Sequence, residues 1–127
     1  MQYKYFYGAQ AEQFSFYRIP KALFTEPNFR ELSTDAKVLY GILLDRMSLS
    51  LKNQWLDAQN KVYIIFTVEE IMDALNCANQ KATRLMVELE KQAGLIERKR
   101  QGLGRPNLIY VKNFAATIND KSCEKGD

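Results

Sequence analysis

Basic side chains gather in one segment of this sequence, residues 95–113. Five cations stand there against the single acid Glu97: Arg98, Lys99, Arg100, Arg105 and Lys112. The segment carries a charge of about +4 and the whole chain carries +3, so the remaining residues sum to about −1. Positive charge that is concentrated in one segment is typical of a protein that binds nucleic-acid phosphates.

A second group of polar side chains lies just before this segment, at the start of a helix that we expect over residues 79–92. The group comprises two amides, a hydroxyl and two cations, namely Asn79, Gln80, Lys81, Thr83 and Arg84. Amides pair with adenine, arginine pairs with guanine, and lysine, threonine and arginine hold phosphate oxygens. Such residues also occur on any solvated helix face, and the basic segment that follows is what favours DNA contact.

Two helices at helix-turn-helix spacing are expected to position these side chains. Thr67 and Glu70 form a capping-box pattern, and Phe66 and Ile71 occupy the positions of a hydrophobic staple, so the first helix is predicted to start at Thr67. This helix would bury Ile71, Met72 and Leu75. The helix over 79–92 would bury a stripe at three- and four-residue steps: Ala82, Leu85, Met86 and Leu89. In a helix-turn-helix, the first residues of the second helix enter the major groove.

The basic segment is predicted to form a β-hairpin. Residues 95–101 are typical of one strand, residues 102–106 of a turn that Gly and Pro permit, and residues 107–114 of the returning strand. A hairpin directly after a helix-turn-helix is the order of parts in a winged helix. The sequence therefore predicts a mixed α/β (α+β) fold of the winged helix-turn-helix class.

Four cations of the predicted wing are candidates for DNA contact: Arg98, Lys99, Arg100 and Arg105. Alternation along the first strand places Lys99 on the face opposite to Arg98 and Arg100, and Arg105 at the turn would probe the minor groove. If four to six such groups neutralise phosphates, log K falls against log salt with a slope of about −4 to −5.

The middle of the chain is expected to supply the core. A short helix or turn interrupted at Pro27 precedes Ser33, which is the predicted N-cap of the longest helix, with Asp35 in its first turn. The inward face of that helix is predicted to be Ala36, Leu39, Tyr40, Leu43, Leu44 and Met47. Residues 50–61 look like a polar connection, and residues 62–66 look like a short buried strand.

The first 20 residues are rich in aromatic side chains and show little helical period, so we expect an extended arm that ends at Pro20. So many aromatic rings must be covered, because burying each one contributes about 1.5–3 kcal/mol relative to exposure. Packing on their own domain is the favoured expectation, and packing on a second copy is the alternative. The candidate residues for a dimer interface are Tyr3, Tyr5, Phe6 and Tyr7.

Composition narrows the class of protein. With 127 residues and 46% hydrophobic content, the chain supports one domain, expected over 1–114, followed by a polar tail over 115–127. No apolar run approaches the roughly 20 residues that a membrane helix needs, which favours a cytoplasmic protein without membrane contact. The chain contains no histidine, and Cys77 and Cys123 form no metal spacing. We therefore expect no enzymatic activity, no cofactor and no metal.

Four blocks of the sequence resemble one known family. They are EQFSFYRIPKALF, LSTDAKVLYGILLDRMSLS, VYIIFTVEEIMDALNC and LIERKRQGLGRPNLIYVKNF, and the match as a whole covers about residues 3–114. They look like the N-terminal domain of the RepA_N family of plasmid replication initiators. The resemblance implies sequence-specific binding of double-stranded DNA at origin repeats, often as a homodimer. It also implies a C-terminal domain, absent here, that contacts host replication proteins.

Carried over to this sequence, the resemblance implies that the recognition helix begins near Asn79 and that the wing holds Arg98, Lys99, Arg100 and Arg105. Two other functions stay open. A winged-helix transcriptional repressor would share these physical features and differ in the DNA that it binds. A winged helix that binds another protein could use the basic hairpin against an acidic partner.

Overall fold

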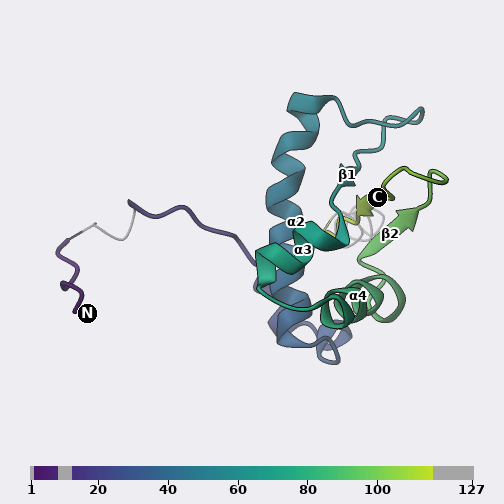
Figure 1. The fold of residues 1–127 in the computed structure, drawn as a ribbon. Coiled ribbons are helices and arrows are strands. Elements are labelled where there is room, and N and C mark those ends of the chain that lie inside the picture. Colours follow the sequence, from purple (N-terminus) through teal and green to yellow (C-terminus); the bar gives the residue numbers. More distant parts are fainter. Residues whose placement is uncertain (1, 9–12, 116–127) are drawn as a thin grey trace, which may run out of the picture.

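A computed structural model describes residues 2–8 and 13–115 (Figure 1). The elements run in the order α1 (Ala22–Thr25), η2 (Pro27–Phe29), α2 (Thr34–Asn53), β1 (Ile64–Ile65), α3 (Val68–Leu75), α4 (Asn79–Val87), η3 (Glu88–Gln92), β2 (Ile96–Lys99) and β3 (Leu108–Val111). The three strands form one antiparallel sheet in the order β1-β3-β2, with α2 packed on β1 and η3 packed on β2. The fold is a winged helix-turn-helix, as predicted. Most of the expected tail over 115–127, including Cys123, lies outside the described residues.

The helix α2 is the central support of the fold. Ser33 caps its start, because the Ser33 Oγ accepts a hydrogen bond from the backbone N–H of Ala36 at 3.2 Å. The helix runs to Asn53, so the prediction of a polar connection from residue 50 is wrong over its first four residues. The reason is that Ser50, only 1% exposed, donates its hydroxyl to the Tyr63 carbonyl at 2.8 Å, which allows a polar side chain inside the packed region.

The helix-turn-helix follows the predicted boundaries. Thr67 and Glu70 form the capping box at the start of α3, with Thr67 N–H donating to the Glu70 carboxylate at 2.9 Å. The left-handed residue Asn76 (φ 53°) ends α3, and α4 begins at Asn79. The last turn of the expected 79–92 helix is a π-helical turn, η3, which a 3.6-residue period does not predict.

The core lies between α2, the helix-turn-helix and the inner face of the sheet. The inward stripe of α4 and η3 is buried as predicted, with Ala82, Leu85, Met86 and Leu89 at most 2% exposed. In α3, Ile71 is fully buried as predicted, but Met72 and Leu75 are only half-buried. From the sheet, Ile64 and Ile109 sit opposite one another in the β1–β3 register and are 0% and 1% exposed. Tyr40 on α2 donates its hydroxyl to the Lys112 carbonyl at 2.8 Å, and burial raises the pKa of this phenol to about 12.

The wing strands are shorter than predicted. Pairing of β2 with β3 runs from Ile96 with Val111 to Lys99 with Leu108, and a loop over residues 100–107 joins them. Gly102 and Gly104 take positive φ angles of 115° and 77° in this loop, a backbone that turns away from strand pairing. Arg100 therefore lies beyond the strand and not on a strand face.

The aromatic side chains of the N-terminal arm stay at least half exposed, so the favoured expectation that their own domain buries them is wrong in the described residues. Residues 13–18 run away from α2 as irregular backbone (Figure 1), and the aromatic side chains of the arm are exposed, with Tyr3 at 86% and Tyr5 at 84%. The root of the arm lies against α2, where Gly41 lets Arg18 and Ile19 approach the helix backbone closely. Within the described residues, no helix is long and apolar enough to cross a membrane.

Candidate nucleic-acid interface

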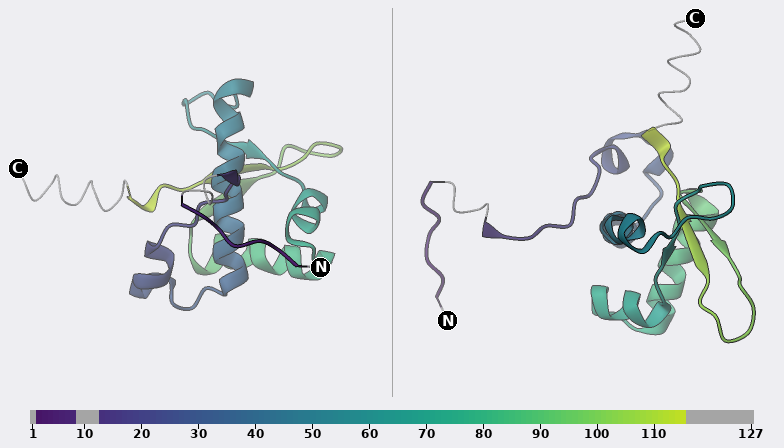
Figure 2. Two further views of the ribbon diagram at one scale, coloured as in Figure 1. Left: turned by 90° about the vertical axis from the view of Figure 1, so that its left-hand side faces the viewer. Right: turned by 90° about the horizontal axis from the view of Figure 1, so that it is seen from above.

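The predicted DNA-contacting parts lie together on one side of α2. Both views in Figure 2 place the wing loop, α3 and the start of α4 on the same side of α2, with α1 and η2 on the opposite side. All five candidate side chains of α4 are exposed: Asn79, Gln80, Lys81, Thr83 and Arg84. Because the same helix buries Ala82, Leu85 and Met86, its outward face is held rigidly toward solvent.

The five α4 side chains differ in their partners. Lys81 Nζ lies 2.7 Å from Asp35 Oδ2 in the first turn of α2, so this ammonium is already paired. Thr83 Oγ1 donates to Asn79 Oδ1 at 3.4 Å, which orients the amide along the helix. Among the described residues, no hydrogen bond or ion pair engages the side chain of Gln80 or Arg84. These two side chains are the ones that can address base edges without first giving up a contact.

The wing cations also fall into two groups. Lys99, Arg100 and Arg105 are exposed, and backbone N–H of Arg105 donates to the Gly102 carbonyl at 3.3 Å, which tightens the loop. Arg98 instead pairs with Glu90 of η3, with Arg98 Nη2 2.7 Å and Arg98 Nε 3.0 Å from Glu90 Oε1. Its side chain is only 26% exposed. The structure thus brings three of the four candidate wing residues to the surface and holds the fourth at the base of the wing.

The ion pair with Arg98 changes the pKa of Glu90. Partial burial opposes ionisation of the carboxyl group, but hydrogen bonds from the Arg98 side chain and backbone, together with its charge, outweigh that effect and hold the pKa of Glu90 below its ordinary value. The pair is therefore ionised at neutral pH.

Sequence reasoning missed Leu103, which is 99% exposed at the wing loop. Apolar side chains at such a position can wedge between base steps in the minor groove. The sequence does contain a signal for Leu103, because a leucine between two glycines in a polar turn is not expected to pack in the core.

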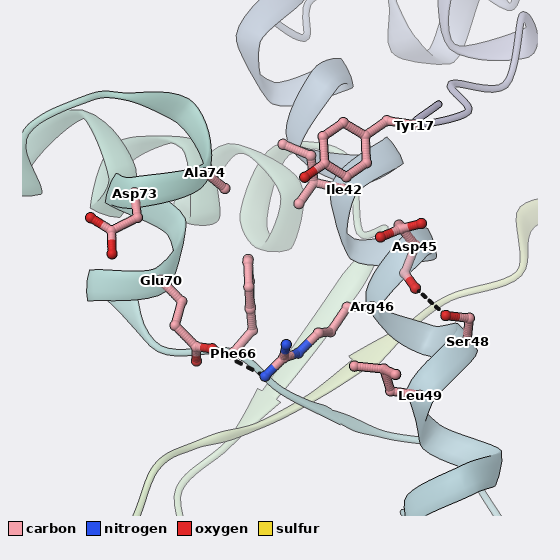
Figure 3. Close-up of a pocket in the computed structure, with 10 residues that line it drawn as sticks. All are labelled: Tyr17, Ile42, Asp45, Arg46, Ser48, Leu49, Phe66, Glu70, Asp73 and Ala74. Atoms are coloured by element: carbon pink, nitrogen blue, oxygen red, sulfur yellow. Dashed lines mark hydrogen bonds and ion pairs between the residues drawn. The ribbon is translucent and has the colours of Figure 1, made fainter. Parts of the chain in front are cut away.

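Arg46 was also missed, and the structure gives it a scaffolding position (Figure 3). It lies in a groove of about 450 Å³ between α2 and α3, where it donates to the Ile65 carbonyl at 3.2 Å and to Glu70 at 3.1 Å. Its guanidinium also lies over the Phe66 ring at 5.2 Å. Arg46 thereby joins the central helix to the capping box that starts the helix-turn-helix.

The chain is similar to known proteins in sequence and in fold. Residues 15–125 match the family described as replication initiator protein A (RepA) N-terminus. The chain belongs to this family of replication initiators. It is also similar to a protein of Lactobacillus helveticus described as a 41 kDa protein, with 32% identity over 103 residues that cover 81% of this chain and 28% of that protein. The chain thus spans less than a third of the length of this relative.

Three solved structures are similar. One is described as the N-terminal domain of a DNA-binding protein, at 39% identity and a TM-score of 0.72, covering 88% of this chain and 85% of that chain. A second is a Rep–DNA complex, at 39% identity and a TM-score of 0.72, covering 87% of this chain and 84% of that one. The third is an MDR initiator, at 38% identity and a TM-score of 0.68, covering 94% and 98%.

Proposed function

We propose that this domain binds double-stranded DNA sequence-specifically at repeats of a plasmid origin and so takes part in initiating plasmid replication. The observation that carries the proposal is the shared surface of α4 and the wing, where Gln80, Arg84, Lys99, Arg100 and Arg105 all reach solvent on one side of α2. Membership of the replication initiator family and similarity to a Rep–DNA complex support the same function.

In the proposed complex, the start of α4 lies in the major groove, where Gln80 and Arg84 address base edges. The wing then lies over the adjacent backbone and minor groove, with Lys99 and Arg100 on phosphates and Arg105 toward the groove. Asp35 holds Lys81 beside the helix start, so Lys81 contacts a phosphate only by sharing or leaving this carboxylate. No step of this function requires a catalytic group or a cofactor.

We further propose that two copies act as a symmetric pair. The exposed aromatic residues of the arm, Tyr3, Tyr5, Phe6 and Tyr7, are the surface for this pairing, because a free protein rarely leaves so many large rings in water. The two copies would place their α4 helices in successive major grooves about 34 Å apart. Contacts with host replication proteins would be made by a part of the protein that this chain does not include, and the protein would act in the cytoplasm.

Fluorescence anisotropy with two labelled duplexes tests the proposal. One duplex carries origin repeats, the other is a scrambled sequence of equal length, and both are titrated from low to physiological salt. The expected result is salt-sensitive binding that prefers the origin by about a thousandfold. Salt-sensitive binding without preference contradicts the origin-specific function, preference for an operator sequence favours a repressor, and no binding to either duplex favours a protein partner.

A further inference from the structure

Two carboxylates of the π-helical turn η3 form hydrogen bonds with two different parts of the fold. Glu88 accepts the backbone N–H and the hydroxyl of Ser33, both at 2.9 Å, and so holds the start of α2. Glu90, two residues further on, accepts three hydrogen bonds from Arg98 at the base of the wing, two from the guanidinium and one from the backbone N–H. One short turn at the end of the recognition helix therefore touches both the central helix and the wing.

The turn itself has little freedom. Ala93 N–H donates to the Glu88 carbonyl at 3.1 Å, which closes the π turn, and Leu89 between the two glutamates is fully buried. Leu95 N–H then donates to the Leu89 carbonyl at 2.8 Å, one residue before β2 begins. A buried anchor and two backbone bonds thus fix where the Glu90 carboxylate points.

Arg98 is placed to receive that carboxylate and not to reach outward. It pairs with the buried Ile109 in the β2–β3 register, which puts its side chain on the inner, helix-facing side of the sheet. The next residue, Lys99, points to the outer side and is exposed. Exposure of the paired side chains is 26% for Arg98 and 18% for Glu90. Charge-assisted hydrogen bonds of this kind are geometrically specific as well as strong.

We propose that Glu90 and Arg98 are a positioning pair that sets the direction of the wing relative to the recognition helix, and that Arg98 does not bind a DNA phosphate. This inference rests on the proposed DNA-binding function and deepens it. The wing phosphate contacts are then made by Lys99, Arg100 and Arg105. When the pair is lost, discrimination between DNA sequences falls, because a wing that can change its direction no longer fixes the register of α4 in the groove.

Salt dependence separates a positioning residue from a phosphate contact. For Arg98→Gln, the slope of log K against log salt stays that of the unaltered protein, while preference for origin over scrambled DNA falls about tenfold. The matched control is its strand neighbour: Lys99→Gln lowers the slope by about one and weakens both duplexes alike. A slope that falls by about one for Arg98→Gln with preference retained overturns the inference.

Exchanging the charges of Glu90 and Arg98 should restore the preference for origin DNA. The double variant with Glu90→Arg and Arg98→Glu restores the ion pair with its signs reversed, so preference returns to within about threefold of the unaltered protein. If Arg98 instead met a phosphate, the exchange would place a carboxylate against DNA and bind more weakly than Arg98→Gln alone. That result overturns the inference. Thermal unfolding followed by circular dichroism shows whether each variant folds. A variant that does not fold is replaced by Glu90→Gln.

A measurement without DNA keeps this inference separate from the proposed function. Spin labels on Thr83→Cys and Asn107→Cys, in a chain with Cys77→Ala and Cys123→Ser, report the distance between α4 and the wing. The unaltered pair gives a narrow distribution, and Glu90→Gln broadens it, whereas labels on Thr83→Cys and Lys52→Cys show no change. An unaltered distribution between α4 and the wing in Glu90→Gln overturns the positioning claim, whether or not the protein binds DNA.

Discussion

The substitution Gly41→Ala tests how the aromatic arm is joined to the domain. A Cβ at position 41 would lie 2.8 Å from Ile19 Cγ1 and 2.9 Å from the Arg18 carbonyl oxygen. Both distances are shorter than real Cβ contacts, and the second involves backbone, so the root of the arm must move.

Two opposing terms set the expected size of the effect. Alanine stabilises a helix interior by about 0.8–1 kcal/mol relative to glycine, and overpacking at a tight contact costs about 1–3 kcal/mol. We therefore expect the free energy of unfolding in urea to fall by about 1 kcal/mol. Limited proteolysis should also cut faster after Arg18, because the root is displaced from α2.

A double-mutant cycle isolates the contact. In a chain that begins at Pro20, Gly41→Ala should stabilise by about 1 kcal/mol, so the coupling between the substitution and the arm is about 2 kcal/mol. Ser48→Ala, on the same helix beside the hollow between arm and α2, is the control and should have the same small effect in both backgrounds. Equal stabilisation by Gly41→Ala with and without the arm would refute the close contact.

Three further predictions concern the interface and its supports. Arg84→Ala should weaken binding to origin DNA by about 1–3 kcal/mol and relax sequence preference, whereas Lys99→Ala should weaken binding to all DNA equally. Equal losses of binding on both duplexes for Arg84→Ala contradict its role in base reading. Glu88→Ala should lower the free energy of unfolding by about 1–3 kcal/mol, because Ser33 loses two bonds to a charged acceptor, and Lys91→Ala on the same turn should change it by less than about 0.5 kcal/mol. Because the pKa of Glu90 is lowered in the folded state, its contribution to stability is complete above the ordinary pKa that the group has in the unfolded chain and is lost as the pH falls through the lower folded value. Urea unfolding at pH 7 and pH 3 should therefore show a smaller acid-induced loss for Glu90→Gln than for the unaltered chain.

Local signals in the sequence were sufficient for the helix-turn-helix. The capping box at Thr67 and Glu70 specifies a helix start through two hydrogen bonds that close within four residues, and the structure contains both. The buried stripe of α4 follows from helical period alone. Ser33 as the N-cap of α2 was predictable for the same reason, since its acceptor and donor lie three residues apart.

Contacts between distant segments could not be read in this way. Glu90 reaches Arg98 because a π turn redirects the chain, and no residue pattern distinguishes that turn from a continuing α-helix. The arm has the composition of a buried strand, yet nothing in its sequence says whether its own domain or another copy covers it. Arg46 carries no signal in the sequence, because a helical arginine is common in positions without function.

In the proposed complex, the side of α2 that carries α4 and the wing is the side that meets DNA. Photo-crosslinking from single positions measures this directly, with a crosslinking residue in place of Gln80 or Leu103 on that side, or of Asn28 in η2 on the opposite side. We predict crosslinks to origin DNA from positions 80 and 103 and none from position 28. Crosslinks from position 28 with none from position 80 would contradict the claim.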